Sequence, residues 1–467
     1  MIHVRVLPII SRLVEDNLSE IRGSVVSMMG DFCIWMGGKW SAILLDVLLC
    51  CFRDSVPEVR AAALSAVPHA VLALIQAAIK ADKGPRDHAI SKLFISLIPA
   101  VCSMHRDVSI PVRVALCTAL SRVLSLVYSV TMNGQLTAYS FMSRLETSMC
   151  DVVLLLLEDK SMQVSTQMIA ELAMSIEKEH HQGYSSYTSA VFTVANSAAL
   201  IRSATLLAKQ ANWRVRKMVC GVIPKLVAGS TTVEKRSAIS DIVQPLLYDA
   251  VFDVRKSAAR AMCIAAECDG DATGLALSGG LTPDGEPLQD MGRMWLDCVV
   301  LPQLEALRTS RVYSNRILSL HMIATIIVED IVHEGDVRYD ILVNIALTLA
   351  SDPIPNVRIA LCEVLAVLAP LMRHDSVLFE AVSRSDKTNK AAASTSAYHR
   401  SHTSLPNMVR TTISSLQGDP DRDVSYLAEK ASRYMDRQGE DPGRGMDGEG
   451  NGMEGGGRKG RKKGPNT

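Results

Sequence analysis

The sequence predicts an all-α protein, an α-solenoid in which about nine antiparallel helix pairs stack into a superhelix. The main observation is a turn motif made of Asp, four residues, an apolar residue and then Arg. Each copy lies between two apolar runs of helical length, and units that pack only on their neighbours are typical of solenoids. The complete copies are Asp16…Ile21-Arg22, Asp54…Val59-Arg60, Asp107…Val112-Arg113, Asp249…Val254-Arg255 and Asp352…Val357-Arg358.

Other copies of the motif are incomplete. Two keep the Asp and have Ser in place of Arg, at Asp159…Ser165 and Asp419…Ser425. A third keeps Arg216 but begins with Gln210. The most degenerate copy covers 310–316, where Asn315 stands at the apolar position. A spacing of roughly 40 to 50 residues between copies matches a unit of two helices and their connections.

Each unit is therefore expected to hold a first helix that ends at the motif and a second helix that begins near the apolar-Arg pair. Apolar residues recur in these runs at the spacing of one helix face. The predicted pairs are 6–14 with 21–32, 42–52 with 59–79, 93–104 with 112–130, 141–157 with 164–176, 191–208 with 215–227, 239–247 with 254–268, 295–307 with 317–328, 341–349 with 357–372, and 408–416 with 424–434.

The residue types of the motif suit a tight turn between two helices. Its Asp can accept hydrogen bonds from backbone N–H groups that open the second helix. Pro57, Pro111 and Pro355 fall where the second helix begins, and a missing N–H is tolerated there. The guanidinium of the motif Arg is expected to bridge to Asp groups of adjacent units. The motif is therefore interpreted as structural.

The solenoid is expected to span 4–436, with two loop insertions and a tail. Residues 269–292 are rich in Gly, Pro and Asp, which favours an exposed loop. Residues 373–405 include a polar Ser/Thr-rich stretch that is expected to be disordered. The tail, 437–467, is Gly-rich with a basic end, and it has too few apolar residues to fold.

Composition narrows the function classes. Lys and Arg together number 49, as do Asp and Glu, so net charge favours neither nucleic acid nor an anionic membrane. Eleven Cys, mostly in apolar runs and without a Cys-x-x-Cys pair, are typical of small buried residues in a reducing compartment. No signal peptide or uninterrupted apolar run of about 18 residues is present. We expect a cytoplasmic protein, with the nucleus as a further location.

The repeat units resemble those of a known family, and two stretches narrow the resemblance. The units are similar to HEAT repeats, and 213–219 (WRVRKMV) resembles a run of the protein phosphatase 2A scaffold subunit. Residues 352–358 (DPIPNVR) resemble a second run of that family, and 58–63 (EVRAAA) a weaker third. The irregular spacing and the two insertions depart from the scaffold's regular units. In this irregularity the chain is more similar to the HEAT-type regulatory subunits of protein phosphatase 4.

The resemblance implies a non-catalytic subunit that binds a serine/threonine protein phosphatase catalytic subunit and directs it to substrates. Partners of that family dock along the turns between paired helices. Carried to this chain, the candidate partner-binding residues are Asn212, Trp213 and Arg214, because a large aromatic and an Arg often dominate interface energies. Packing of Trp213 on a neighbouring turn is the alternative. An importin-like adaptor for cargo proteins is the alternative function.

No catalytic residue, metal site or cofactor is predicted. A phosphate-binding loop fails at Gly37-Gly38-Lys39, which lacks the spacing and the hydroxyl residue, and no Gly-x-Ser-x-Gly elbow occurs. His180 and His181 lie in a polar stretch that is expected to be a solvated connector. The sequence therefore predicts a binding protein rather than an enzyme.

Overall fold

In the computed structural model the chain forms two compact units, 1–339 and 340–467. The structure describes residues 2–36, 38–80, 93–132, 142–182, 187–193, 195–230, 232–271, 295–332, 336–371 and 405–436. Within these ranges the regular secondary structure is helical. The predicted all-α solenoid is confirmed, and the described helices form nine pairs, as expected.

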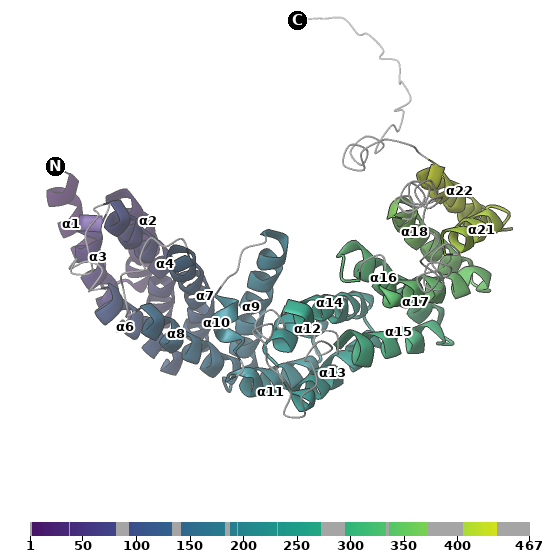
Figure 1. The fold of residues 1–467 in the computed structure, drawn as a ribbon. Coiled ribbons are helices and arrows are strands. Elements are labelled where there is room, and N and C mark those ends of the chain that lie inside the picture. Colours follow the sequence, from purple (N-terminus) through teal and green to yellow (C-terminus); the bar gives the residue numbers. More distant parts are fainter. Residues whose placement is uncertain are drawn as a thin grey trace, which may run out of the picture. The chain divides into compact units, whose positions relative to one another are not determined.

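The first compact unit holds seven of the pairs (Figure 1). The first helix of the third pair is divided into short segments η1, α6 and η2, and that of the seventh into η5 and α15. In chain order the pairs are α1 (Ile2–Leu13) with α2 (Ser19–Met36), α3 (Gly38–Cys51) with α4 (Pro57–Lys80), η1 (Leu93–Leu97), α6 (Ile98–Ser103) and η2 (Met104–Arg106) with α7 (Ile110–Met132), α8 (Met142–Leu157) with α9 (Met162–Gln182), α11 (Ser197–Ala208) with α12 (Trp213–Ala228), α13 (Val233–Leu247) with α14 (Phe252–Asp271), and η5 (Leu296–Val300) and α15 (Leu301–Arg308) with α16 (Tyr313–Val328).

The second compact unit contains the last two pairs. Helix α17 (Val337–Leu347) runs across the boundary and continues into η6 (Thr348–Ser351). It is followed by α18 (Pro355–Leu371) and then by the pair α21 (Leu405–Gln417) and α22 (Arg422–Asp436). Helix α22 packs on both α18 and α21, so the second helices of successive pairs meet here too.

Second helices pack on second helices along the first compact unit. Helix α4 lies between α2 and α7, and the series continues through α9, α12, α14 and α16 (Figure 1). The first helices follow one another along the opposite face, where α8 contacts α6 and α11 contacts α13. Most of these helices thus contact their own partner and a helix of an adjacent pair, which builds a continuous apolar core along this unit.

The motif residues pack as the sequence predicts. The apolar position, for example Val59, Val112 or Val254, is fully buried. The side-chain oxygen of the motif Asp accepts the backbone N–H two residues later, as Asp54 does from Val56 at 2.8 Å. This N–H lies just before the second helix rather than within it. Pro57 and Pro355 are the first residues of their helices, as expected.

The motif Arg connects successive helix pairs. The Nε and NH2 groups of Arg60 donate to the carboxylate of Asp107 in the next pair, at 2.7 and 2.8 Å, while NH1 donates to the carbonyl of Asp54 in its own turn at 2.7 Å. We call such a two-bond contact between an Arg and the next pair's Asp a rung. The predicted bridging is confirmed, and the rungs are Arg22–Asp54, Arg60–Asp107, Arg113–Asp159, Arg216–Asp249 and Arg358–Asp419.

Two local predictions were wrong. The stretch with His180 and His181 is not a loop, because α9 continues to Gln182. The helix predicted over 191–208 is broken: α10 (Thr188–Val191) ends before α11 begins at Ser197. The side chain of Tyr187, at the start of α10, is buried, and its hydroxyl lies 2.8 Å from Ser121 Oγ and 3.2 Å from Ser175 Oγ. Anchoring of this turn between α7 and α9 explains the break.

Two helices have a high mean hydropathy although charged or polar residues interrupt their apolar runs. Pro57–Gln76 in α4 and Ile110–Ser129 in α7 are long and apolar enough to cross a membrane by length and composition. In the structure 61% and 50% of these stretches are buried against other helices, which is the behaviour of core helices in a solenoid.

The insertions 269–292 and 373–405 and the tail 437–467 lie almost entirely outside the described residues, so they stay predictions. At their edges, α14 extends to Asp271 and α21 already begins at Leu405, which is buried. Among the described cysteines, Cys117, Cys220 and Cys263 are buried as expected, whereas Cys50 is exposed. Burial raises the pKa of the Cys220 thiol to about 12.

Candidate partner-binding surface

The candidate residues Asn212, Trp213 and Arg214 form the turn that opens α12. Asn212 is the N-cap, and its side-chain oxygen accepts the N–H of Arg214 at 3.0 Å. Asn is a favoured residue for this position. Trp213, the first helical residue, is half-buried, and Asn212 and Arg214 are exposed. The structure therefore brings the three residues together on a solvent-facing turn.

Arg214 stacks on the Trp213 ring. Its guanidinium carbon lies 4.8 Å from the ring centroid, within the range of a cation–π contact. The stacked pair presents an aromatic edge and a fixed positive charge at the same point of the surface. Such a surface can pack an apolar side chain of another protein and pair with a carboxylate beside it.

This turn also marks an interruption in the rungs. The preceding pair has Ser165 where the motif has Arg, and the turn itself has Gln210 where the motif has Asp. Both partners of a rung are replaced together. Ser165 Oγ still donates to the carbonyl of Asp159 at 3.2 Å, and Arg216 still donates to the carbonyl of Gln210 at 2.7 Å. Each turn keeps its internal bond and loses only the link between the pairs.

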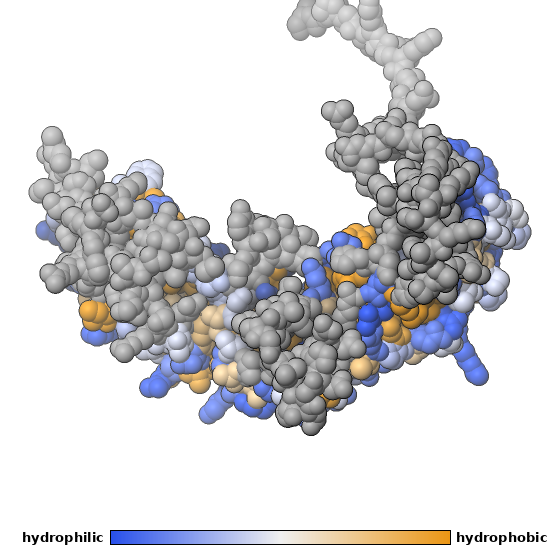
Figure 2. All heavy atoms as spheres, viewed as in Figure 1, coloured by the Kyte–Doolittle hydropathy of each residue, from blue (hydrophilic) through white to orange (hydrophobic). Residues whose placement is uncertain are grey.

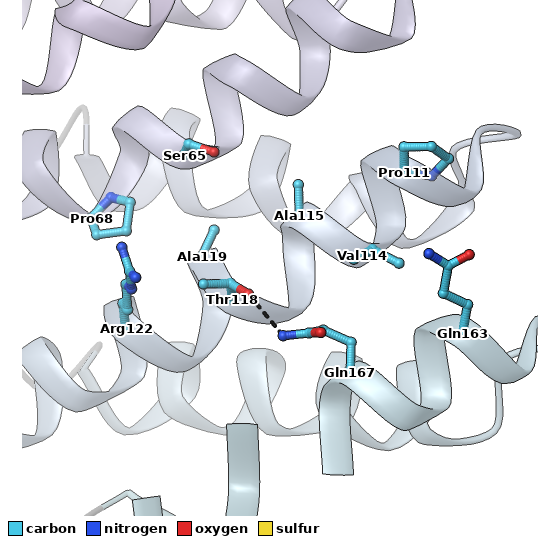
Figure 3. Close-up of a pocket in the computed structure, with 10 residues that line it drawn as sticks. All are labelled: Ser65, Pro68, Pro111, Val114, Ala115, Thr118, Ala119, Arg122, Gln163 and Gln167. Carbon is cyan, nitrogen blue, oxygen red and sulfur yellow. Dashed lines mark hydrogen bonds between the residues drawn. The ribbon is translucent and has the colours of Figure 1, made fainter. Parts of the chain in front are cut away.

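A second candidate surface is a groove of about 490 Å³ between the second helices α4, α7 and α9. Its centre consists of small side chains, and its rim carries the polar groups of Arg122, Gln163 and Gln167 (Figure 3). The groove was not predicted from the sequence, because its residues come from three separate helices and share no motif. Its lining residues are Ser65, Pro68, Pro111, Val114, Ala115, Thr118, Ala119, Arg122, Gln163 and Gln167.

A polar network holds one wall of this groove. Glu171 is nearly buried and accepts hydrogen bonds from Thr118 Oγ1 at 2.7 Å and from Gln167 Nε2 at 2.9 Å. Gln167 Nε2 also donates to Thr118 Oγ1 at 3.3 Å (Figure 3). The network joins α7 to α9, and the groups that remain accessible in the groove suit hydrogen bonding to a ligand rather than bond cleavage.

Exposed apolar side chains are spread over the described surface. Figure 2 shows several separate orange areas among charged residues in that view, rather than one large apolar face. The most exposed large aromatic is Trp35 in α2, at 87%. Single exposed apolar residues are common in monomers and by themselves do not indicate a binding site. Within the described residues no group of three or more His, Cys, Asp or Glu is arranged to hold a metal ion.

Comparisons with known proteins give structural similarity alone. No family model matches the sequence, and no curated protein does. Among solved structures, a chain from the Kap95p–RanGDP complex is 13% identical over 92% of this chain and 54% of its own, with a TM-score of 0.43. Importin beta is 12% identical over 91% and 53%, with a TM-score of 0.43. A designed armadillo repeat protein is 15% identical over 56% and 99%, with a TM-score of 0.31.

The described helices by themselves define the protein as a helical-repeat solenoid. This chain spans about half the length of the two transport-related chains that it matches. At these identities and TM-scores the comparisons identify neither a partner nor an activity.

Proposed function

We propose that the protein is a non-catalytic scaffold that binds a serine/threonine protein phosphatase catalytic subunit and helps direct it to substrates. The observation that carries the proposal is the stacked pair Trp213–Arg214 on an exposed turn. The residue run that contains it, 213–219, is also the one that most resembles the phosphatase scaffold. Residue type, exposure and resemblance thus favour the same turn.

The way in which the rungs are arranged supports a scaffold role. Because every rung side chain is engaged between helix pairs, the motif residues hold the solenoid together and leave partner binding to the atypical turns. The turn at Trp213 is an atypical one that carries a large aromatic and has Gln210 in place of the motif Asp. An array held by rungs, with an atypical turn at Trp213, can position a bound enzyme relative to its substrate.

The test is capture from cell extract with the tagged full chain, followed by binding to the purified catalytic subunit. The proposal expects a phosphatase catalytic subunit among the captured proteins, with phosphatase activity on the beads. A small GTPase and cargo captured in its place would refute the phosphatase proposal and favour the importin-like alternative.

The variant Trp213→Ala tests the site. Loss of a central aromatic anchor weakens binding by roughly 30-fold or more, because such residues contribute about 2 kcal/mol or more to an interface. Trp35→Ala is the control, since that ring is exposed and lies away from this turn in the sequence, on α2. Unchanged binding together with a clear loss of thermal stability in Trp213→Ala would show that Trp213 is a packing residue instead.

A further inference from the structure

One Arg of the motif has no Asp to contact. Arg255 makes the internal half of the usual arrangement, because its NH1 donates to the carbonyl of Asp249 at 2.7 Å and to that of Ala250 at 3.2 Å. The next turn has Ser310 where the motif has Asp. Among the described residues, the Nε and NH2 groups of Arg255 make no hydrogen bond or ion pair. The two-donor edge that holds a carboxylate in every rung is unfilled here.

This position differs from the other interruption of the rungs. Between Ser165 and Gln210 both the Arg and the Asp are replaced, so no charge is left over. Between α14 and α16 the Arg is kept and the carboxylate alone is missing. Helices α14 and α16 still pack on each other, and Cys263 Sγ of α14 lies 3.7 Å from the carbonyl of Met322 in α16. The two helix pairs therefore remain in contact although no rung joins them among the described residues.

Ser310 makes the same hydrogen bonds within its turn as a motif Asp does. Its Oγ accepts the N–H of Val312, two residues later, at 3.2 Å, the same contact that the motif Asp makes in other turns. Its carbonyl accepts Arg316 NH1 at 2.8 Å, as the carbonyl of a motif Asp does. The side chain of Asn315 donates to the same Oγ at 3.0 Å. Within its own turn, the Ser310 hydroxyl thus takes the position of the motif carboxylate, the group that receives the preceding pair's Arg in the rungs.

We propose that Ser310 is a phosphorylation site and that its phosphate is bound by the free Nε and NH2 groups of Arg255, which completes the missing rung. A phosphoryl group carries about −1.5 to −2 charges and three acceptor oxygens, and guanidinium binds such groups through two parallel bonds. Asn315 Nδ2 is a further donor beside it. The link joins α14 to α16 and restrains the rotation of one helix pair on the next.

The chemistry needs ATP and a protein kinase. The Ser310 Oγ forms a bond to the γ-phosphorus of ATP as the bond from that phosphorus to the departing ADP oxygen breaks, and the hydroxyl proton passes to the kinase's base. The flanking residues Arg308 and Arg311 suit a kinase that prefers basic substrates. Ser310 lies on a turn and is half-exposed, and Arg311 is exposed. This proposal is independent of the phosphatase-binding role.

The first test asks whether Arg255 holds the phosphate. Full-length protein with phosphoserine incorporated at position 310 is titrated by phosphorus NMR. A free phosphoserine has a second pKa of about 6, and contact with a guanidinium should lower it by about one unit. Arg255→Gln should return the pKa to about 6, whereas the control Arg311→Gln should leave it low. An identical pKa in the Arg255 variant and the parent would overturn the proposal.

A second test avoids the phosphate and measures the rung itself. Ser310→Asp restores the motif, so its thermal midpoint should exceed that of Ser310→Ala by a few degrees, and the gain should vanish when Arg255→Gln is added. A gain that persists without Arg255 would show mere helix capping. For the modification, the peptide that contains Ser310 is analysed by mass spectrometry from protein isolated with phosphatase inhibitors. Recovery of only unmodified peptide would overturn the assignment.

Discussion

The substitution Asp107→Asn isolates the energetic role of one rung. The amide of Asn keeps an oxygen that can accept the N–H of Ser109, which Asp107 Oδ1 accepts at 2.8 Å, so the turn itself is preserved. The change removes the negative charge and places an NH2 group where Oδ2 accepts Arg60 Nε at 2.7 Å. A donor then faces a donor, and the guanidinium loses its charged partner.

The magnitude follows from the burial of the pair. The side chains of Arg60 and Asp107 are 11% and 8% exposed. Exposed ion pairs contribute about 0–1 kcal/mol, while breaking a fully buried pair costs about 3–5 kcal/mol. Two short charge-assisted bonds at low exposure fall between these limits. We therefore expect Asp107→Asn to lower the free energy of unfolding by about 2 kcal/mol.

The assay is urea unfolding followed by far-ultraviolet circular dichroism, with native-state hydrogen exchange to locate the loss. Asp16→Asn is the matched control, because Asp16 makes the same turn contact, to the N–H of Leu18 at 2.8 Å, and receives no Arg from a preceding pair within the described residues. The control should lose less than about 0.5 kcal/mol. Exchange should accelerate where α4 packs on α7. Equal losses in the two variants would refute a stabilising role of the rung.

Two more predictions concern pH and helix contacts. Hydrogen bonds from Arg lower the pKa of Asp54 and Asp419, so their stabilisation is complete above the unfolded value of about 3.9 and is lost as pH falls through the lower folded values. The thermal midpoint should therefore drop below about pH 4, and a constant midpoint down to about pH 2 would contradict this. In α12, Gly221→Ala would place Cβ 2.9 Å from Ala173 Cβ and should cost about 1–3 kcal/mol, whereas Gly23→Ala, whose nearest neighbour is 4.0 Å away, should stabilise by up to about 1 kcal/mol. Calorimetry of both variants measures the signs, and a gain in both would refute the packing argument.

The sequence predicted the helix pairs because their signals are local. An Asp, an apolar residue and an Arg within one turn specify where the first helix ends and the second begins, and these contacts span at most six residues, as from Arg60 NH1 to the Asp54 carbonyl. The failures also have local causes. The break before Ser197 depends on Tyr187 reaching Ser121, 66 residues earlier, which no nearby residue indicates.

Residue types alone located the candidate turn, but they did not predict that Arg214 stacks on Trp213. The sequence indicated that Asn212, Trp213 and Arg214 adjoin a helix start, but the orientation of the guanidinium over the ring depends on side-chain rotamers at the head of α12. The groove beside Arg122 had no sequence signal, because α4, α7 and α9 contribute its walls from distant positions.

By itself, then, the sequence determined the repeat, the helix pairs and the internal hydrogen bonds of each turn, because these depend on residues close together in the chain. Only the tertiary structure decided which Asp each Arg contacts, since that partner is set by how adjacent pairs pack. Arg113 reaches Asp159 across 46 residues, while Arg255, in the same motif, makes no such contact in the described part of the chain. The free donors of Arg255 become visible only when the pairs are stacked, and they lead to the proposal for Ser310.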